Sequence, residues 1–208
     1  MKNKKAMYAL SYGLFVLTAR QGDKDNGCII NTAMQVTTDP NRIVITVNKA
    51  NHTHDMVLQT GLFTLSVLSE QAGFPLFQRF GFQSGRDTDK FQGFSEHARR
   101  GDNGILQVTR GVCAWLSCKV VSTVDLGTHT LFLADVEDGD LLSDVPAVTY
   151  AYYQAHIKPQ PQAAPAAQGS KKRWVCTVCG YVYEGEFLPD DFICPLCKHP
   201  ASDFELLE

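Results

Sequence analysis

Short apolar runs separated by polar turn residues dominate the first three quarters of the chain. Five runs have the length and the β-branched or aromatic content of strands. They are RIVITVNKA, LFTLSVLS, ILQVTRG, AWLSCKVVSTVDLG and HTLFLADVEDGDLL. The stretch VVSTVDLGTHTLFLADV predicts two strands joined by a turn at Gly127. The pattern therefore indicates a mainly β domain.

Helical patterns are fewer. THDMVLQTG predicts a helix with Thr53 as its N-cap and Gly61 at its end, and FPLFQRFGF predicts a shorter helix. A regular alternation of strands and helices is missing, as is a Gly-x-Gly-x-x-Gly or Walker-type loop, which argues against a Rossmann dinucleotide domain. We therefore expect a β-barrel with a few helices packed against it.

The stretch IKPQPQAAPAAQGSKK interrupts this pattern with proline, alanine and glutamine and has almost nothing to bury. We interpret it as a linker, because such a segment in extended polyproline-type conformation reaches ~3.1 Å per residue. The predicted organisation is a barrel over residues 1–157, a linker over 158–172 and a small domain over 173–208.

Composition and charge limit the cellular location and the kinds of partner that we expect. The 208 residues are 44% hydrophobic, enough for an ordinary globular core, and no run approaches the ~18 apolar residues of a membrane span. The basic N-terminus lacks the features of a signal peptide, so we expect a cytoplasmic protein with no membrane association. From Trp174 onward there are one lysine and seven acids, which disfavours nucleic acid and suits either a basic protein partner or simple solubility.

Cysteine usage points to a metal rather than to disulfides. Four of the seven cysteines form two Cys-x-x-Cys pairs with 14 residues between the pairs: Cys176, Cys179, Cys194 and Cys197. Four thiolates in a tetrahedral arrangement suit zinc and a single iron equally. The other three, Cys28, Cys113 and Cys118, are expected to be small buried apolar residues.

The surroundings of the pairs favour iron. Five of the aromatic residues among the last 35 positions predict a dry shell, which controls the potential of a redox metal: Trp174, Tyr181, Tyr183, Phe192 and Phe204. The stretches CTVCGYVYEGE and CPLC resemble rubredoxin, whose iron ligands match the four cysteines. The gap between the pairs is shorter than in free-standing rubredoxins and is similar to that of the rubredoxin domain of rubrerythrins.

Polar side chains between and beside the strands suggest a second ligand. Amides, hydroxyls and an ammonium group suit a flat heterocycle that carries a phosphate, and a helix start offers free N–H groups to that phosphate. Taken singly, each residue also suits a cap, a turn or the surface. The residues are Asn31, Thr32, Gln35, Asn48, Lys49 and Thr53, with Lys90 farther along the chain.

Residues from about 7 to 158 resemble the flavin reductase family with the FMN-binding split barrel, which includes flavoredoxins. The resemblance is carried by NGCIINTAMQVTTDP, VNKANHTHDM, FTLSVLSE, SGRDTDKF and LGTHTLFLADV. It implies isoalloxazine contacts at Asn31, Thr32, Ala33 and Gln35. It implies contacts to the ribityl phosphate end at Asn48, Lys49, His52, Thr53 and Lys90. It also implies His129 beside the flavin or nicotinamide, and a homodimer.

The two halves together resemble the fused flavin reductase and rubredoxin proteins known as high molecular weight rubredoxins. This resemblance implies an NAD(P)H:rubredoxin oxidoreductase that passes electrons from NADH through FMN to one iron and on to a partner such as a flavodiiron protein. A flavin suits this chain of carriers because it accepts hydride and releases single electrons.

Two alternatives stay open. One is a ferric or free-flavin reductase with the iron module as a side branch, and the other is a non-enzymatic electron carrier or a zinc-held docking module. The sequence does not distinguish NADH from NADPH.

Overall fold

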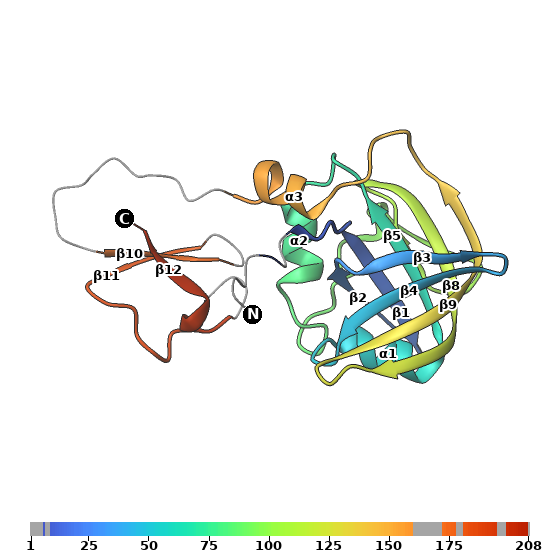
Figure 1. Cartoon of the computed structure of the whole chain (residues 1–208), viewed down its shortest axis with the longest axis horizontal. Coiled ribbons are helices and arrows are strands. Elements are labelled where there is room, and N and C mark those ends of the chain that lie inside the picture. The colour runs from blue at the N-terminus through green and yellow to red at the C-terminus, as the bar shows by residue number, and fades with distance from the viewer. Residues whose placement is uncertain (1–5, 7–8, 160–171, 178–180, 195–198, 208) are drawn as a thin grey trace.

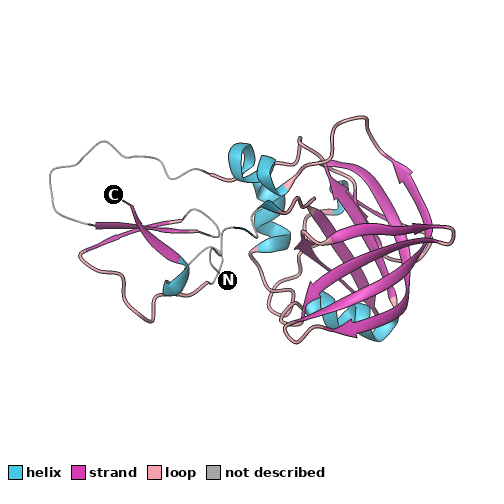
Figure 2. Cartoon of the chain, in the orientation of Figure 1, coloured by secondary structure: helices cyan, strands magenta, loops and turns pink. Residues whose placement is uncertain are grey.

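A computed structural model describes residues 6, 9–159, 172–177, 181–194 and 199–207 (Figure 1). Seven strands form one antiparallel sheet in the order β2-β1-β5-β8-β9-β4-β3, which curls around a core with β2 and β3 at its edges (Figures 1 and 2). The bounds are β1 (Phe15–Gln21), β2 (Lys24–Ile30), β3 (Ala33–Thr38), β4 (Asn41–Asn48), β5 (Leu62–Leu68), β8 (Val112–Asp125) and β9 (His129–Leu141). The predicted mainly β fold with a few helices is confirmed.

The turn between the two longest strands lies where the glycine predicted it. Gly127 has φ 84°, a conformation that favours glycine, and Leu126 N–H donates to the His129 carbonyl at 2.9 Å to close the β8–β9 hairpin. The predicted strand in ILQVTRG is short: β7 (Leu106–Val108) pairs with β6 (Ala98–Arg100).

Three strands were not expected from the apolar runs. In β1 and β2 the apolar residues are interrupted by polar ones, and in β3 five of the six side chains are exposed. The polar residues weaken the apolar signal of these strands, whose backbones are held by antiparallel pairing of β1 with β2 and of β3 with β4.

The core fills the inside of the curled sheet. Along β4, buried and partly exposed positions alternate, so that Ile43, Ile45 and Val47 point inward. They pack with Leu17, Phe63 and Phe132, all fully buried. Cys28 and Cys118 belong to the same cluster, and burial raises the pKa of the Cys118 thiol to about 12.

Helix α1 (His52–Thr60) packs against β1 and β2. It ends as predicted at Gly61, which has φ 69° and donates its N–H to the Val57 carbonyl at 2.9 Å. Its start differs from the prediction. Asn51 is the N-cap residue, without a side-chain capping bond, and Thr53 lies within the first turn.

A second apolar cluster lies outside the barrel. Helix α2 (Phe74–Gly81) buries Phe77 and Phe80, and the chain segment α3 (Tyr150–Tyr152) continues as a π-helical turn, η3 (Tyr153–Ile157). The cluster includes Phe94, near the short helix η2 (Ser95–His97), and Tyr153. None of the helices in the described part of the chain is long and apolar enough to cross a membrane.

The C-terminal residues form a separate small module (Figure 2). Its strands are β10 (Lys172–Cys176), β11 (Val182–Gly185) and β12 (Phe204–Leu207), in the order β11-β10-β12, and a helical turn, η4 (Ala201–Asp203), precedes β12. Both pairings of β10 are antiparallel.

Candidate metal and flavin sites

The first cysteine of each predicted pair begins a turn of the same form. Cys176 donates its N–H to the Tyr181 carbonyl at 2.8 Å, and Cys194 donates its N–H to the His199 carbonyl at 2.8 Å. Each hydrogen bond therefore spans five residues and closes a loop that holds the rest of its Cys-x-x-Cys pair. Cys179 and Cys197 lie outside the described residues.

The predicted aromatic shell is present. Cys176 and Cys194 have no exposed surface and form one buried cluster with Phe204. Phe192 connects this shell, with ring centroids 4.6 Å from Tyr183 and 5.4 Å from Phe204. The other shell residues packed on the cluster include Trp174 and Tyr181.

This donor set fits a thiolate-bound metal. Two matching turns bring sulfur atoms into one dry cluster, and soft thiolate ligands suit iron and zinc. Within the described ranges no group of three or more His, Cys, Asp or Glu residues gathers as a metal site, and two of the four predicted ligands fall outside those ranges. The structural support for a metal site therefore comes from Cys176 and Cys194.

The start of α1 has an arginine beside it that is paired with an acid of the same helix. Arg86 donates to Asp55 Oδ2 at 2.7 Å and lies 3.5 Å from Nδ1 of His52. Burial and the nearby Arg86 guanidinium lower the pKa of His52. Hydrogen bonds from His54 and Arg86 lower the pKa of Asp55. Sequence reasoning missed Arg86, although it stands in the quoted stretch SGRDTDKF.

Close packing brings the SGRDTDKF loop onto β2. Asn26 donates its amide N–H to Oγ1 of Thr53 at 3.1 Å, and both side chains are buried. A Cβ added to Gly85 would lie 2.2 Å from Oδ1 of Asn26, so only glycine allows this approach. The Thr53 hydroxyl is thus engaged inside the protein, while its backbone remains at the helix start.

Lys90 occupies a different position from the one expected. Its side chain is only 3% exposed, and Nζ donates to the Gly27 carbonyl at 2.8 Å and to the Phe80 carbonyl at 3.1 Å. Burial lowers the pKa of the ammonium group. Lys90 therefore fastens the loop to β2 and α2, which places Arg86 at α1.

Three other predicted residues gather at one end of β4. The β4–β9 register pairs Asn48 with His129, and Lys49 N–H donates to the Thr128 carbonyl at 3.0 Å. The Lys49 ammonium lies 2.7 Å from Asp125 Oδ1, and hydrogen bonding to Lys49 lowers the pKa of that carboxyl. The structure thus brings together these three residues around the β8–β9 hairpin.

The predicted ring contacts follow β2 into β3 and line two cavities. A cavity of about 820 Å³ is lined by Asn31, and a cavity of about 260 Å³ by Ala33 and Gln35. The Thr32 hydroxyl donates to Oδ1 of Asn31 at 3.1 Å. The first cavity has room for a planar ring system, and its lining is mainly apolar and aromatic.

Family models match both parts of the chain. The flavin reductase-like domain matches residues 7–160, and the rubredoxin-like domain of rubrerythrin matches residues 174–205.

Two curated relatives are also similar. The chain is 35% identical over 226 residues to the high molecular weight rubredoxin of Moorella thermoacetica, which covers 97% of this chain and 98% of the relative. It is 37% identical over 149 residues to the ferric-chelate reductase (NAD(P)H) of Archaeoglobus fulgidus, which covers 72% of this chain and 87% of the relative.

Solved structures share the barrel fold. The NADH:FAD oxidoreductase SgcE6 of Streptomyces globisporus superposes with a TM-score of 0.61 at 21% identity, covering 70% of this chain and 85% of the other. The styrene monooxygenase flavin reductase of Pseudomonas putida S12 has a TM-score of 0.60 at 23% identity, covering 72% and 92%. These structures show the fold, while the family model and the two curated relatives confirm the expected enzyme class, an oxidoreductase of the flavin reductase type. The chain belongs to the flavin reductase-like family and carries a rubredoxin-like domain after its barrel.

Proposed function

We propose that this protein is an NAD(P)H:rubredoxin oxidoreductase that passes electrons from NAD(P)H through FMN to one iron held by four cysteines. The observation that carries the proposal is the pair of matching cysteine turns, buried in an aromatic shell, in one chain with a flavin reductase barrel. A flavin accepts two electrons as hydride, whereas a thiolate-bound iron accepts one at a time. Zinc has no redox chemistry and would leave this combination without a use.

The start of α1 supports a place for the FMN phosphate. The helix lacks a side-chain cap, so the backbone N–H groups of His52 and Thr53 face a possible anion without a capping side chain. The Arg86 guanidinium, paired with Asp55, lies beside them and adds positive charge. Lys90 supports this site by holding the loop rather than by touching the phosphate.

The isoalloxazine ring of FMN is then expected near the C-terminal end of β2. Asn26, which contacts Thr53, and Asn31, which lines the large cavity, are separated by five residues of nearly extended chain, or about 16 Å. This span is comparable with the length of FMN from phosphate to ring. We propose that Asn31, Thr32, Ala33 and Gln35 border the ring. Asn48 and Lys49 are proposed to lie at the ribityl phosphate end with His52 and Thr53, and His129 next to the hydride position.

The exposed surfaces support proposals for the oligomeric state and for the electron-acceptor protein. The outer face of β3, β8 and β9 exposes large apolar side chains, among them Met34 at 64%, Val124 at 52% and Leu141 at 72%. Such a face suits a second copy of the chain, so we propose a homodimer, which light scattering would test. The acidic C-terminal module suits a basic acceptor, for which a flavodiiron protein is our proposal.

The domain limits 1–157, 158–172 and 173–208 and a cytoplasmic location stay predictions. The family matches at 7–160 and 174–205 are compatible with these limits. A reducing compartment suits a site built from thiolates.

An anaerobic titration with NADH and with NADPH tests the relay and its cofactor preference. Flavin and iron absorbance should bleach together in the full chain. A chain ended at Gln168 should still oxidise NAD(P)H through FMN but should no longer reduce the acceptor protein. Undiminished delivery by the shortened chain would contradict the relay.

A ferric-chelate or free-flavin reductase is the second candidate, and the similarity to the Archaeoglobus fulgidus reductase favours it. Stopped-flow reduction distinguishes the two, because a relay requires the iron to be reduced through FMN faster than overall turnover. A yellow protein that contains zinc after anaerobic expression would instead favour a docking module.

A further inference from the structure

The C-terminal module contacts the barrel domain at the end of α2. Phe82, which follows the last residue of this helix, packs against the buried cluster of Cys176, Cys194 and Phe204. Its ring also lies 5.8 Å from that of Phe74 at the start of the same helix. One aromatic side chain of the barrel domain therefore completes the apolar shell around the cysteines.

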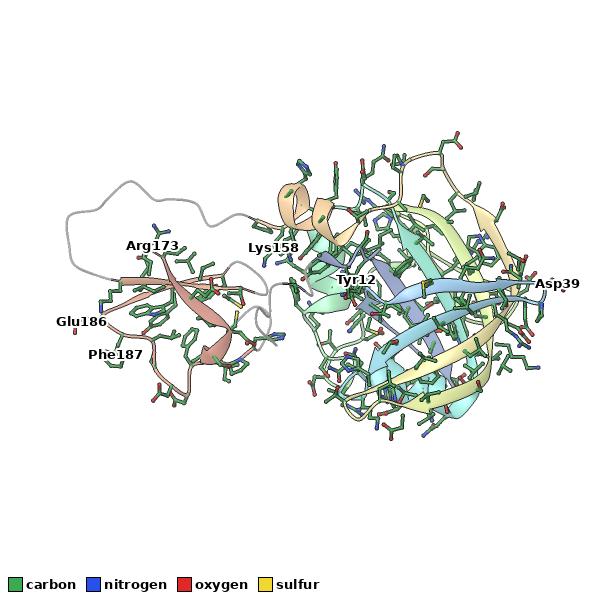
Figure 3. All side chains as sticks on the ribbon, viewed as in Figure 1. Tyr12, Asp39, Lys158, Arg173, Glu186 and Phe187 are labelled. Carbon is green, nitrogen blue, oxygen red and sulfur yellow. The ribbon has the colours of Figure 1, made fainter. Side chains whose placement is uncertain are left out.

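A polar contact lies beside this aromatic one. The Lys158 ammonium donates a hydrogen bond to the carbonyl oxygen of Thr177, the residue directly after Cys176. Inside the module, the N–H and hydroxyl of Thr177 both donate to the Asp203 carbonyl, at 2.8 and 3.0 Å. These two bonds fix the orientation of Thr177, so that its carbonyl oxygen faces the barrel domain. Figure 3 shows Lys158 on the side of the barrel domain that faces the module.

The two contacts border the large cavity. Its lining includes Asn31 at the end of β2, Phe82 of the barrel domain and Thr177 of the module. The same cavity thus touches a predicted flavin-ring residue and the neighbour of a predicted iron ligand.

We propose that Phe82 and Lys158 form a docking site for the chain's own C-terminal module, which holds the first cysteine turn against the flavin cavity for electron transfer. The inference rests on the proposed function. A flavin bound there would accept hydride from NAD(P)H, leaving NAD(P)+, and would release two single electrons and one proton, the proton to water. An iron held by the cysteines would accept each electron in its ferric state and, as ferrous iron, pass it to the acceptor protein before the second transfer.

The proposed docking has to be reversible, as electron-transfer encounters commonly are. Among the described residues, the contacts that join the two parts include the Phe82 ring and the Lys158 hydrogen bond. The module must also leave, because an acceptor protein needs access to the same iron. The segment predicted from its sequence to be a linker, 158–172, would keep a released module at high local concentration.

The test uses full-length variants with one matched control. Phe82→Ala removes the aromatic contact, and Lys158→Gln weakens the polar contact by replacing the charged donor with a shorter, neutral one. Phe187→Ala is the control, because Phe187 is 68% exposed and lies on the far side of the module from the barrel (Figure 3). Lys158→Gln also keeps the test valid if Phe82→Ala disturbs the end of α2.

Two measurements are made on each variant. Small-angle X-ray scattering reports whether the module has left the barrel, and stopped-flow spectroscopy reports flavin and iron bleaching separately. We expect Phe82→Ala and Lys158→Gln to increase the radius of gyration and to slow iron bleaching about tenfold, in proportion to a tenfold loss of the docked population. Flavin bleaching should be unchanged in Lys158→Gln, and Phe187→Ala should behave as the natural chain. Because Phe82 lines the flavin cavity, Phe82→Ala is judged by its scattering and by the rate of iron bleaching relative to that of flavin bleaching.

Unchanged scattering and unchanged iron bleaching in both contact variants would overturn the docking site. Failure of the proposed function has a different signature. In that case NAD(P)H does not reduce the iron even in the unaltered chain, while the scattering of the variants still decides whether the module docks at Phe82 and Lys158.

Discussion

Replacing Lys90 by methionine tests whether this lysine stabilises the fold or binds the FMN phosphate. Methionine keeps the apolar stem but leaves the carbonyls of Gly27 and Phe80 without their donor. A hydrogen bond from a charged group contributes about 1.5–3 kcal/mol, and the change also removes the cost of burying the ammonium. We expect Lys90→Met to lower the free energy of unfolding by about 3 kcal/mol, which corresponds to a Tm lower by roughly 6–12 °C.

Urea unfolding followed by circular dichroism measures this change, and FMN fluorescence titration at low and high salt measures flavin affinity. Arg86→Met is the matched counterpart. The Arg86 side chain is 50% exposed, so its ion pair with Asp55 should contribute at most about 1 kcal/mol to stability. Its loss should weaken FMN binding and reduce the dependence of binding on salt, because one phosphate contact is missing.

The opposite pattern would refute this reasoning. If Lys90→Met leaves the free energy of unfolding within about 0.5 kcal/mol of the natural value while the salt dependence of FMN binding falls, Lys90 binds the phosphate directly. If Arg86→Met leaves FMN affinity unchanged, the start of α1 is not the phosphate site.

Three further predictions follow from the same contacts. Gly85→Ala should force the loop away from Asn26, lower stability by about 1–3 kcal/mol and weaken FMN binding, whereas Gly73→Ala, whose added Cβ has its nearest neighbour at 3.5 Å, should leave FMN binding unchanged; titration and urea unfolding check both. The lowered pKa of Asp55 means that its contribution to stability is present above the ordinary value of 3.8 and is lost as pH falls through the lower folded-state pKa. Asp55→Asn should therefore flatten the fall in Tm below about pH 4, and an unchanged acid profile would exclude this pair as a cause. Cys194→Ser should remove most of the bound metal, measured by elemental analysis, while NAD(P)H oxidation through FMN persists; full metal loading in this variant would contradict the ligand assignment.

Local sequence was sufficient for the features that depend on neighbours in the chain. The apolar run RIVITVNKA predicted a strand where β4 lies, and Gly61 and Gly127 predicted a helix end and a hairpin turn. The Cys-x-x-Cys spacing predicted a cluster of thiols, of which Cys176 and Cys194 lie together in the structure. In each case the physical cause acts within a few residues: side chains alternate along a strand, glycine accepts positive φ, and two thiolates on a tight turn share one ion.

Contacts between distant residues were decided only by the folded chain. The charge of Lys90 suits a phosphate ligand, but its Nζ donates a hydrogen bond in the protein interior to the carbonyl of Gly27, 63 residues earlier in the chain. Arg86 reaches His52, 34 residues earlier, only because Gly85 lets the loop approach β2. Phe82 enters the shell of the cysteines although the linker separates them in sequence. No local sequence pattern predicts these contacts, because they depend on how the sheet curls and on which polar groups form hydrogen bonds inside the folded protein.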